Sequence, residues 1–143
     1  INYIVVHCSA TREGCTLTSE VLEAEHRRRG FRTTGYHYYI RRDGTVLGTR
    51  SLELPGAHCR GHNKYSIGIC YEGGLDARGN PKDTRTPEQR SALHLLVYQL
   101  LQQFRNARVC GHRDLSPDLD GDGTVEPWEW VKQCPCFEVS KEF

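Results

Sequence analysis

The sequence predicts an α/β domain with a central mixed β-sheet flanked by helices. Short apolar runs rich in β-branched residues alternate with two segments of helical periodicity, a pattern typical of α/β domains. An Asp-Gly pair between two of these runs adds a hairpin to the sheet. The 143 residues are enough for one compact domain with its own hydrophobic core, so we expect a single domain over residues 1–143.

The first predicted elements are a strand and a helix. Residues 1–6 are mostly apolar and β-prone, as expected of a buried strand. Thr18 or Ser19 can cap a helix that continues over residues 20–29 and stops at Gly30. The three consecutive arginines at the end of this helix are interpreted as solvated residues that the helix dipole favours, not as a binding patch.

A hairpin and another strand follow. Residues 36–40 and 46–47 are β-prone, and the Asp-Gly pair between them is a strong turn signal. Residues 66–71 predict a further strand. The Gly-, Asp- and Pro-rich composition of residues 74–87 predicts a surface loop.

The second helix has the clearest sequence signals. Thr86 can serve as its N-cap, Pro87 suits its first position, and Gln89 completes a capping box. Its apolar residues repeat at helical spacing and form one wide face, made of Leu93, Leu96, Val97, Leu100, Leu101 and Phe104. We interpret it as a core helix without a functional role, and we expect residues 107–110 to form the strand that leads to His112.

Charge and hydropathy exclude several classes of partner. The net charge is +1, which indicates no nucleic-acid partner, and no run of about 18 apolar residues is present, which indicates no membrane span. No signal-peptide pattern opens the chain. We therefore expect a monomer that is either cytoplasmic, with release by lysis, or exported after removal of a signal.

The chain contains an odd number of cysteines, so a framework made only of disulfides would leave a thiol over. A domain with a proper core does not need such a framework, and we favour mostly reduced thiols with one or more reserved for a metal. The cysteines are Cys8, Cys15, Cys59, Cys70, Cys110, Cys134 and Cys136.

Three places carry residues that can bind a metal. His7 follows the first predicted strand, His112 follows the last one, and Cys134 and Cys136 flank a proline near the C-terminus. Ligands so far apart in sequence do not suit a zinc finger, but they suit a catalytic site with three protein ligands and one position for water. From spacing alone, histidines that merely pack in the core or lie at the surface remain the alternative.

Six sequence blocks, in this order, resemble those of the type 2 N-acetylmuramoyl-L-alanine amidases, a family of zinc amidases that includes small phage amidase lysozymes and is related to the peptidoglycan recognition proteins. The matches extend from residue 6 to residue 137. The blocks are Val6-His7-Cys8-Ser9-Ala10-Thr11, Gly35-Tyr36-His37-Tyr38, Arg42-Asp43-Gly44-Thr45, Asn63-x-x-Ser66-Ile67-Gly68-Ile69, Gly111-His112-Arg113-Asp114 and Lys132-x-Cys134-Pro135-x-Phe137.

The resemblance implies a zinc cofactor held by His7, His112 and Cys134, since the family pattern places the cysteine ligand before the proline. It also implies the family fold and the substrate, which is peptidoglycan or a muropeptide. The expected reaction is hydrolysis of the amide bond between N-acetylmuramic acid and L-alanine. The expected single domain would thus be a zinc amidase domain.

The resemblance further implies that Tyr36 and Lys132 are catalytic. Zinc lowers the pKa of a bound water toward neutrality, and the positive charge of Lys132 would stabilise the oxyanion that forms. His58 matches a family position near the substrate groove, so we expect it to bind substrate. The remaining histidines at positions 26, 37, 62 and 94 are interpreted as packing or surface residues.

An acidic segment between the last two expected ligands departs from the family pattern. It fits the template of a calcium-binding loop, with Asp118, Asp120 and Asp122 offering carboxylates, Thr124 its carbonyl and Glu129 a bidentate carboxylate. A proline inside the loop and the lack of flanking helices argue against calcium. The alternative is an acidic hairpin stabilised by its own turns.

Two other functions are alternatives to the amidase. A non-catalytic peptidoglycan-binding module is the first, because some relatives keep the fold and bind the wall without cutting it. Another zinc hydrolase that acts on a different amide is the second. The presence of Cys134 together with Tyr36 and Lys132 favours the enzyme.

Overall fold

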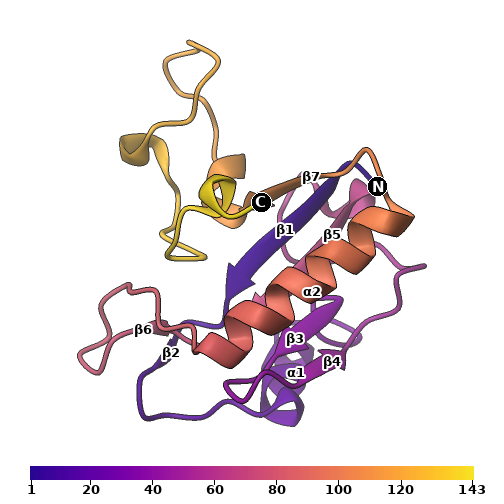
Figure 1. The fold of residues 1–143 in the computed structure, drawn as a ribbon, viewed down its shortest axis with the longest axis vertical. Helices are drawn as coiled ribbons and strands as arrows, with labels where there is room; N and C mark the ends of the chain where they lie inside the picture. Colours follow the sequence, from indigo (N-terminus) through magenta and orange to yellow (C-terminus); the bar gives the residue numbers. More distant parts are fainter.

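The computed structural model describes residues 1–143, which form a central mixed sheet with one main helix on each face (Figure 1). The sheet has five strands in the order β4-β3-β5-β1-β7. Only β4 is antiparallel to its neighbour; the other pairs are parallel. The strands are β1 (Tyr3–Cys8), β3 (Tyr38–Ile40), β4 (Val46–Gly48), β5 (Ser66–Tyr71) and β7 (Arg108–Gly111). The predicted fold class is confirmed.

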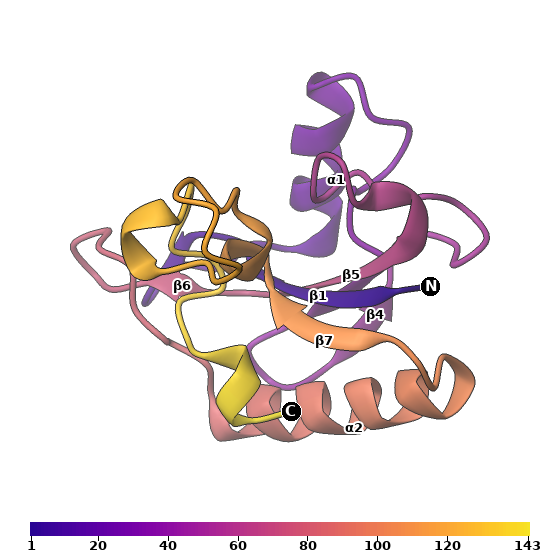
Figure 2. The same cartoon turned by 90° about the horizontal axis from the view of Figure 1, so that it is seen from above.

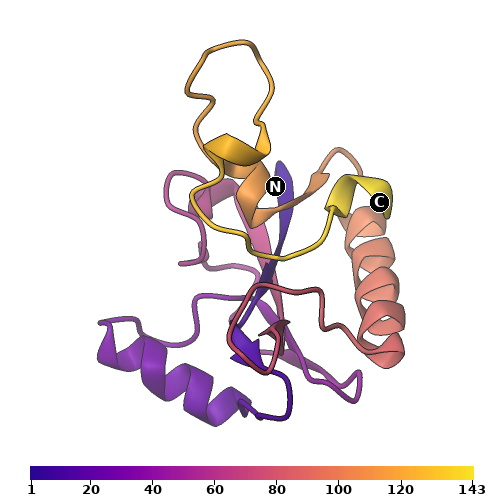
Figure 3. The ribbon, with the colours of Figure 1, turned by 90° about the vertical axis from the view of Figure 1, so that its left-hand side faces the viewer.

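The two helices, α1 (Ser19–Arg28) and α2 (Pro87–Gln103), cover opposite faces of the sheet, as Figures 2 and 3 show. The Thr18 side chain accepts a hydrogen bond from the backbone of Val21 and caps α1. Thr86 and Gln89 form the capping box expected at the start of α2. Both helices therefore begin where the sequence signals predicted.

The main core lies between α2 and the sheet. Leu93 and Val97 of α2 pack against side chains from one face of β1 and β5, including Ile4 and Ile69. Since side chains alternate along a strand, the other residues of β1, among them His7, point to the α1 face. That face has a much smaller apolar cluster, and polar side chains are buried there instead.

A second, two-stranded sheet pairs β2 (Thr11–Arg12) with β6 (Gly74–Leu75). The sequence had predicted only a surface loop from residue 74 onward, and this part of the prediction is wrong. A pair of two-residue strands is too short to show any periodicity, so its pairing comes from tertiary contacts rather than from local sequence.

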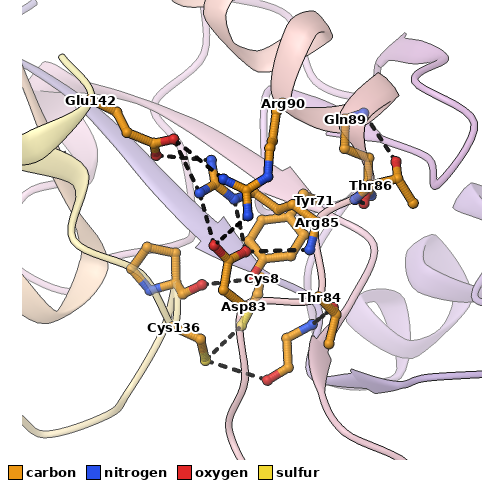
Figure 4. A network of polar contacts seen from close by, with 12 residues as sticks. Cys8, Tyr71, Asp83, Thr84, Arg85, Thr86, Gln89, Arg90, Cys136 and Glu142 are labelled. Carbon is orange, nitrogen blue, oxygen red and sulfur yellow. Dashed lines mark hydrogen bonds and ion pairs between the residues drawn. The ribbon is translucent and has the colours of Figure 1, made fainter.

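The chain after β7 contains little regular structure beyond three short 3₁₀ turns, η2 (His112–Leu115), η3 (Pro127–Glu129) and η4 (Val139–Lys141). Polar contacts anchor this C-terminal segment to the rest of the domain (Figure 4). The Tyr71 hydroxyl donates a hydrogen bond of 2.6 Å to the carbonyl of Pro135. The buried Arg85 guanidinium lies 3.0 Å from Glu142 and stacks 3.3 Å from the ring centroid of Phe137.

All seven cysteines are free thiols in the structure. The sulfur atoms of Cys8 and Cys136 lie 4.0 Å apart. Neither main helix has both the length and the apolar composition required to cross a bilayer.

We predict that Leu93→Ala lowers the free energy of unfolding by about 2–5 kcal/mol, because the mutation leaves a cavity at a fully packed position. Leu93 is only 1% exposed, whereas Leu95 on the same helix is 58% exposed. Leu95→Ala is therefore the matched control and should change stability by less than about 0.5 kcal/mol. Urea denaturation of both variants tests this, and equal losses would contradict the assigned orientation of α2.

Candidate active site

The metal-capable side chains predicted from the sequence converge at the carboxyl end of β1, on the α1 face of the sheet. His7 belongs to β1, and His112 follows β7 directly. The parallel register pairs Val6 with Gly111, and each of these residues is followed directly by one of the two histidines. Cys134 arrives from the C-terminal segment, and its sulfur accepts a hydrogen bond of 3.2 Å from the backbone amide of Cys8.

One ligand atom each from His7, His112 and Cys134 lies within 4.8 Å of the other two. Zinc bonds of about 2.0–2.3 Å to nitrogen and sulfur fit such a group after small side-chain adjustments. Two imidazoles and a thiol are a donor set that zinc prefers, and the Cys8 amide stabilises negative charge on the Cys134 sulfur. The residues present therefore fit a zinc ion.

Burial keeps His7 in the form that a metal requires. The pKa of His7 lies well below its ordinary value, first because the ring is buried and then because a proton on it would be repelled by positive charge on its neighbours, among them Lys132. A neutral imidazole has a free lone pair, so His7 can coordinate a metal without first losing a proton.

The trio opens into a cavity of about 310 Å³ between α1 and the C-terminal segment. Tyr36, His58 and Lys132 line it together with the three metal-capable residues. The structure thus brings together every residue for which the sequence predicted a role in zinc binding, catalysis or substrate binding. The surroundings of two of these residues, Tyr36 and His58, differ from what the sequence predicted.

Tyr36 was expected inside a strand, but β3 begins only at Tyr38. Tyr36 lies in the irregular segment before the strand and lines the cavity, where its ring centroid lies 5.0 Å from that of His7. The pKa of Tyr36 is raised well above its ordinary value, mainly because the hydroxyl is buried and secondarily because cysteine sulfurs surround it. Tyr36 therefore keeps its proton and can act as a hydrogen-bond donor.

His58 lines the cavity, but its imidazole also contacts a metal-capable residue, which the sequence did not indicate. Its Nδ1 lies 2.9 Å from Nε2 of His7. Burial, reinforced by the nearby charges of His37 and His112, lowers the pKa of His58 to about 3. Both rings of the pair are thus neutral near pH 7.

Leu22, Glu25 and His26 of α1, with Arg29 just after the helix, line one side of the cavity. The sequence assigned no site role to them. His26 is buried and its Nδ1 accepts a hydrogen bond of 2.8 Å from the amide of Gly35. This contact holds the residue that precedes Tyr36. The only sequence feature that could have indicated the position of His26 is its spacing from Leu22, which places both side chains on the same face of the helix.

His37 is a packing residue, as its position in the sequence suggested. It is not among the residues that line the cavity, and its ring nitrogens contact backbone groups: Nδ1 accepts a hydrogen bond from Gly68, and Nε2 lies 2.9 Å from the carbonyl of Leu54. It therefore connects three segments of the chain behind the site.

The acidic segment lies outside this cavity, in a loop that projects from the sheet in Figure 3. Its carboxylates form two groups, Asp118 with Asp120 and Glu129, and Asp120 with Asp122 and Glu126. Glu126 was not among the expected ligands, and no single group contains all the carboxylates that were.

Backbone amides already occupy several of the acidic oxygens. Asp118 accepts hydrogen bonds from Gly121 and Gly123, and one oxygen of Glu129 accepts from Leu119 and Asp120. The loop is thus stabilised by its own turns, which is the alternative to calcium that the sequence allowed. Calcium binding stays a prediction.

Three protein ligands beside an open cavity are typical of catalytic zinc sites, in which the fourth position is left for water or substrate. The fold narrows this class further. The chain belongs to the N-acetylmuramoyl-L-alanine amidase family, whose sequence profile matches residues 1–135.

Individual proteins agree with this assignment. The endolysin of Klebsiella phage KP32 is 36% identical over 138 residues, which cover 96% of this chain and 82% of the endolysin. The N-acetylmuramoyl-L-alanine amidase LysC from Clostridium intestinale superposes with a TM-score of 0.75 at 27% identity, over 99% of this chain and 80% of LysC. Bumblebee PGRP-SA has the same fold, with a TM-score of 0.72 at 22% identity over 99% of this chain and 79% of its own. The expected family, fold and enzyme class are confirmed.

We predict that Cys134→Ser abolishes tight zinc binding and that Cys136→Ser does not, because only the Cys134 sulfur lies with the two histidines. Elemental analysis of both purified variants tests this. Loss of zinc from Cys136→Ser with retention by Cys134→Ser would contradict the arrangement described.

Proposed function

We propose that this chain hydrolyses the amide bond between N-acetylmuramic acid and L-alanine in peptidoglycan, using a zinc ion held by His7, His112 and Cys134. The observation that carries the proposal is the convergence of these three side chains with Tyr36 and Lys132 around one cavity. The family of the chain supports the same reaction.

When bound, zinc would supply Lewis-acid activation of water and of the scissile carbonyl. The residues of the chain contribute the rest. The ammonium group of Lys132 stabilises the negative charge that develops on the carbonyl oxygen during attack. The Tyr36 hydroxyl, which keeps its proton, donates a hydrogen bond to the same developing charge.

The charge of the ligand set makes Lys132 important. A thiolate from Cys134 leaves a zinc site at a formal charge of about +1 rather than +2, which weakens the metal as a Lewis acid. A neighbouring ammonium group compensates for this weakening. Lys132 lines the same cavity as Cys134, two residues away along the chain.

Several further expectations belong to this proposal. Residues 1–143 act as one zinc amidase domain and as a monomer, and the substrate is peptidoglycan or a muropeptide. His58 lines the cavity, and we expect it to contact the substrate there. The alternative function, a non-catalytic peptidoglycan-binding module, would have no use for Lys132 beside a complete ligand set.

We predict that the protein releases new L-alanine amino termini from purified cell wall without creating reducing sugar ends, that a chelator stops the release and that zinc restores it.

Lys132→Met should lower kcat about 10²–10³-fold with zinc content unchanged, because it removes charge stabilisation from the transition state. Lys141→Met, at an exposed lysine, is the control. Wall binding without any release would favour the binding module, and reducing ends would indicate a glycosidase.

We further propose that the acidic loop binds calcium. The ion would have a structural role, because it would stabilise the position of the segment that carries Lys132 and Cys134. We predict that millimolar calcium raises the Tm of the zinc-loaded protein, because an ion bound only by the folded state stabilises it. Asp120, which belongs to both carboxylate groups, is the residue to change. Asp120→Asn should remove the shift, and a flat response of the unmodified protein would rule calcium out.

A further inference from the structure

His7 has two ring nitrogens, and the structure commits one of them to a protein partner. Its Nε2 lies 2.9 Å from Nδ1 of His58, at hydrogen-bond distance. A ring nitrogen that shares its proton with one neighbour cannot also coordinate a metal, so Nδ1 of His7 is the nitrogen left for zinc.

His58 is itself anchored on its opposite side. Its Nε2 lies 3.1 Å from the hydroxyl of Ser66, which is buried at the start of β5. The backbone amides of His58 and Cys59 both donate hydrogen bonds of 2.8 Å to Oδ1 of Asn63. Side chain and backbone of His58 are therefore fixed independently of any substrate.

The choice of metal-binding nitrogen in His7 determines where the protons lie in the hydrogen-bonded series of His7, His58 and Ser66. If Nδ1 of His7 coordinates zinc, its Nε2 carries the proton and donates to Nδ1 of His58. The proton of neutral His58 then sits on Nε2 and is donated to the Ser66 hydroxyl. His58 then accepts one hydrogen bond and donates the other, and neither contact is mismatched.

Two glycines make room for the His58 ring. A Cβ atom at Gly68 would lie 2.6 Å from Cδ2 of His58, and a Cβ atom at Gly56 would also overlap that carbon. His37, fixed by backbone groups, lies next to it with a distance of 6.0 Å between the ring centroids. The pocket around His58 thus holds an imidazole in one orientation.

We propose that His58 is a positioning residue, which fixes the tautomer and the ring orientation of His7 through the series Ser66, His58 and His7. The inference rests on the proposed zinc site and deepens it. Hydrogen bonds to metal-bound histidines hold the ring in place and raise its basicity, and their loss typically costs about 10–100-fold in metal affinity or activity. His58 need not contact the substrate to serve this purpose.

A pair of variants separates the acceptor atom from the volume of the side chain. His58→Asn places an amide oxygen near the position of Nδ1, whereas His58→Leu has a similar size and no acceptor. We predict that His58→Leu weakens zinc binding about 10–100-fold, measured by competition with a chromophoric chelator, and that His58→Asn recovers most of the loss. His94→Leu, at a half-exposed histidine of α2, is the control and should bind zinc like the unmodified protein.

Zinc affinity is measured without reference to catalysis, so the outcomes can be told apart. Equal zinc affinity of His58→Leu and the unmodified protein would overturn the positioning role, and so would equal weakening in both His58 variants. If the unmodified protein binds no zinc, the proposed metal site falls as well. If it binds zinc normally but releases no amino termini from cell wall, only the proposed reaction falls.

Two further measurements keep the proposal testable if His58→Leu does not fold, which far-ultraviolet circular dichroism of the metal-free form would reveal. Ser66→Ala leaves both histidines in place and removes only the anchor, and we expect a weaker loss of zinc affinity in the same direction. Nitrogen-15 spectra of the histidine rings in the zinc-loaded protein should assign the metal to Nδ1 of His7 and the proton to Nε2. A metal on Nε2 would overturn the proposal.

Discussion

The parallel pairing of β1 with both of its neighbours is the constraint on which the rest of the site depends. Register with β7 places Val6 opposite Gly111, and each of these residues is followed directly by a histidine, His7 in β1 and His112 just past β7. Register with β5 places His7 beside Cys70 and brings Ser66 and Gly68 under the His58 ring. A shift of either pairing by one residue would turn the imidazole of His7 toward α2, because side chains alternate along a strand.

The same alternation lets β1 serve stability and chemistry at once. Ile4 and Val6 pack toward α2, where the large apolar cluster lies, while His7 points toward the cavity. The rigid core thus supports the first metal-capable ligand directly. Cys134, in contrast, lies on an irregular segment, and its position depends on the tertiary contacts of the residues that follow it.

Local signals in the sequence were sufficient to predict most of the fold. Thr18, Thr86 and Gln89 are caps whose chemistry involves only a few neighbouring residues, and the structure has them where expected. The resemblance to a family supplied the site residues, which spacing alone had left open. What could not be predicted depends on contacts between distant segments. Arg85 looked like a loop residue, yet its guanidinium is buried against Phe137.

The contact of His58 with His7 escaped prediction for the same reason. The residues around His58 have no periodic pattern, and the room for its ring comes from glycines at positions 56 and 68, which act by lacking a side chain. A missing Cβ atom leaves no trace in hydrophobic periodicity or charge. The role of these glycines becomes apparent only from the structure, which shows the His58 ring in the space that a side chain would fill.

The anchoring of the C-terminal segment has a consequence for how this domain can be joined to other modules. Glu142, the penultimate residue of the chain, forms an ion pair with the buried Arg85, and the segment before it carries Cys134. A partner domain fused directly after residue 143 would lie close to this ion pair, and it could disturb the C-terminal segment that positions the Cys134 sulfur. The N-terminus leads into the end of β1 farthest from His7, so a linker placed there would attach away from the metal-capable residues.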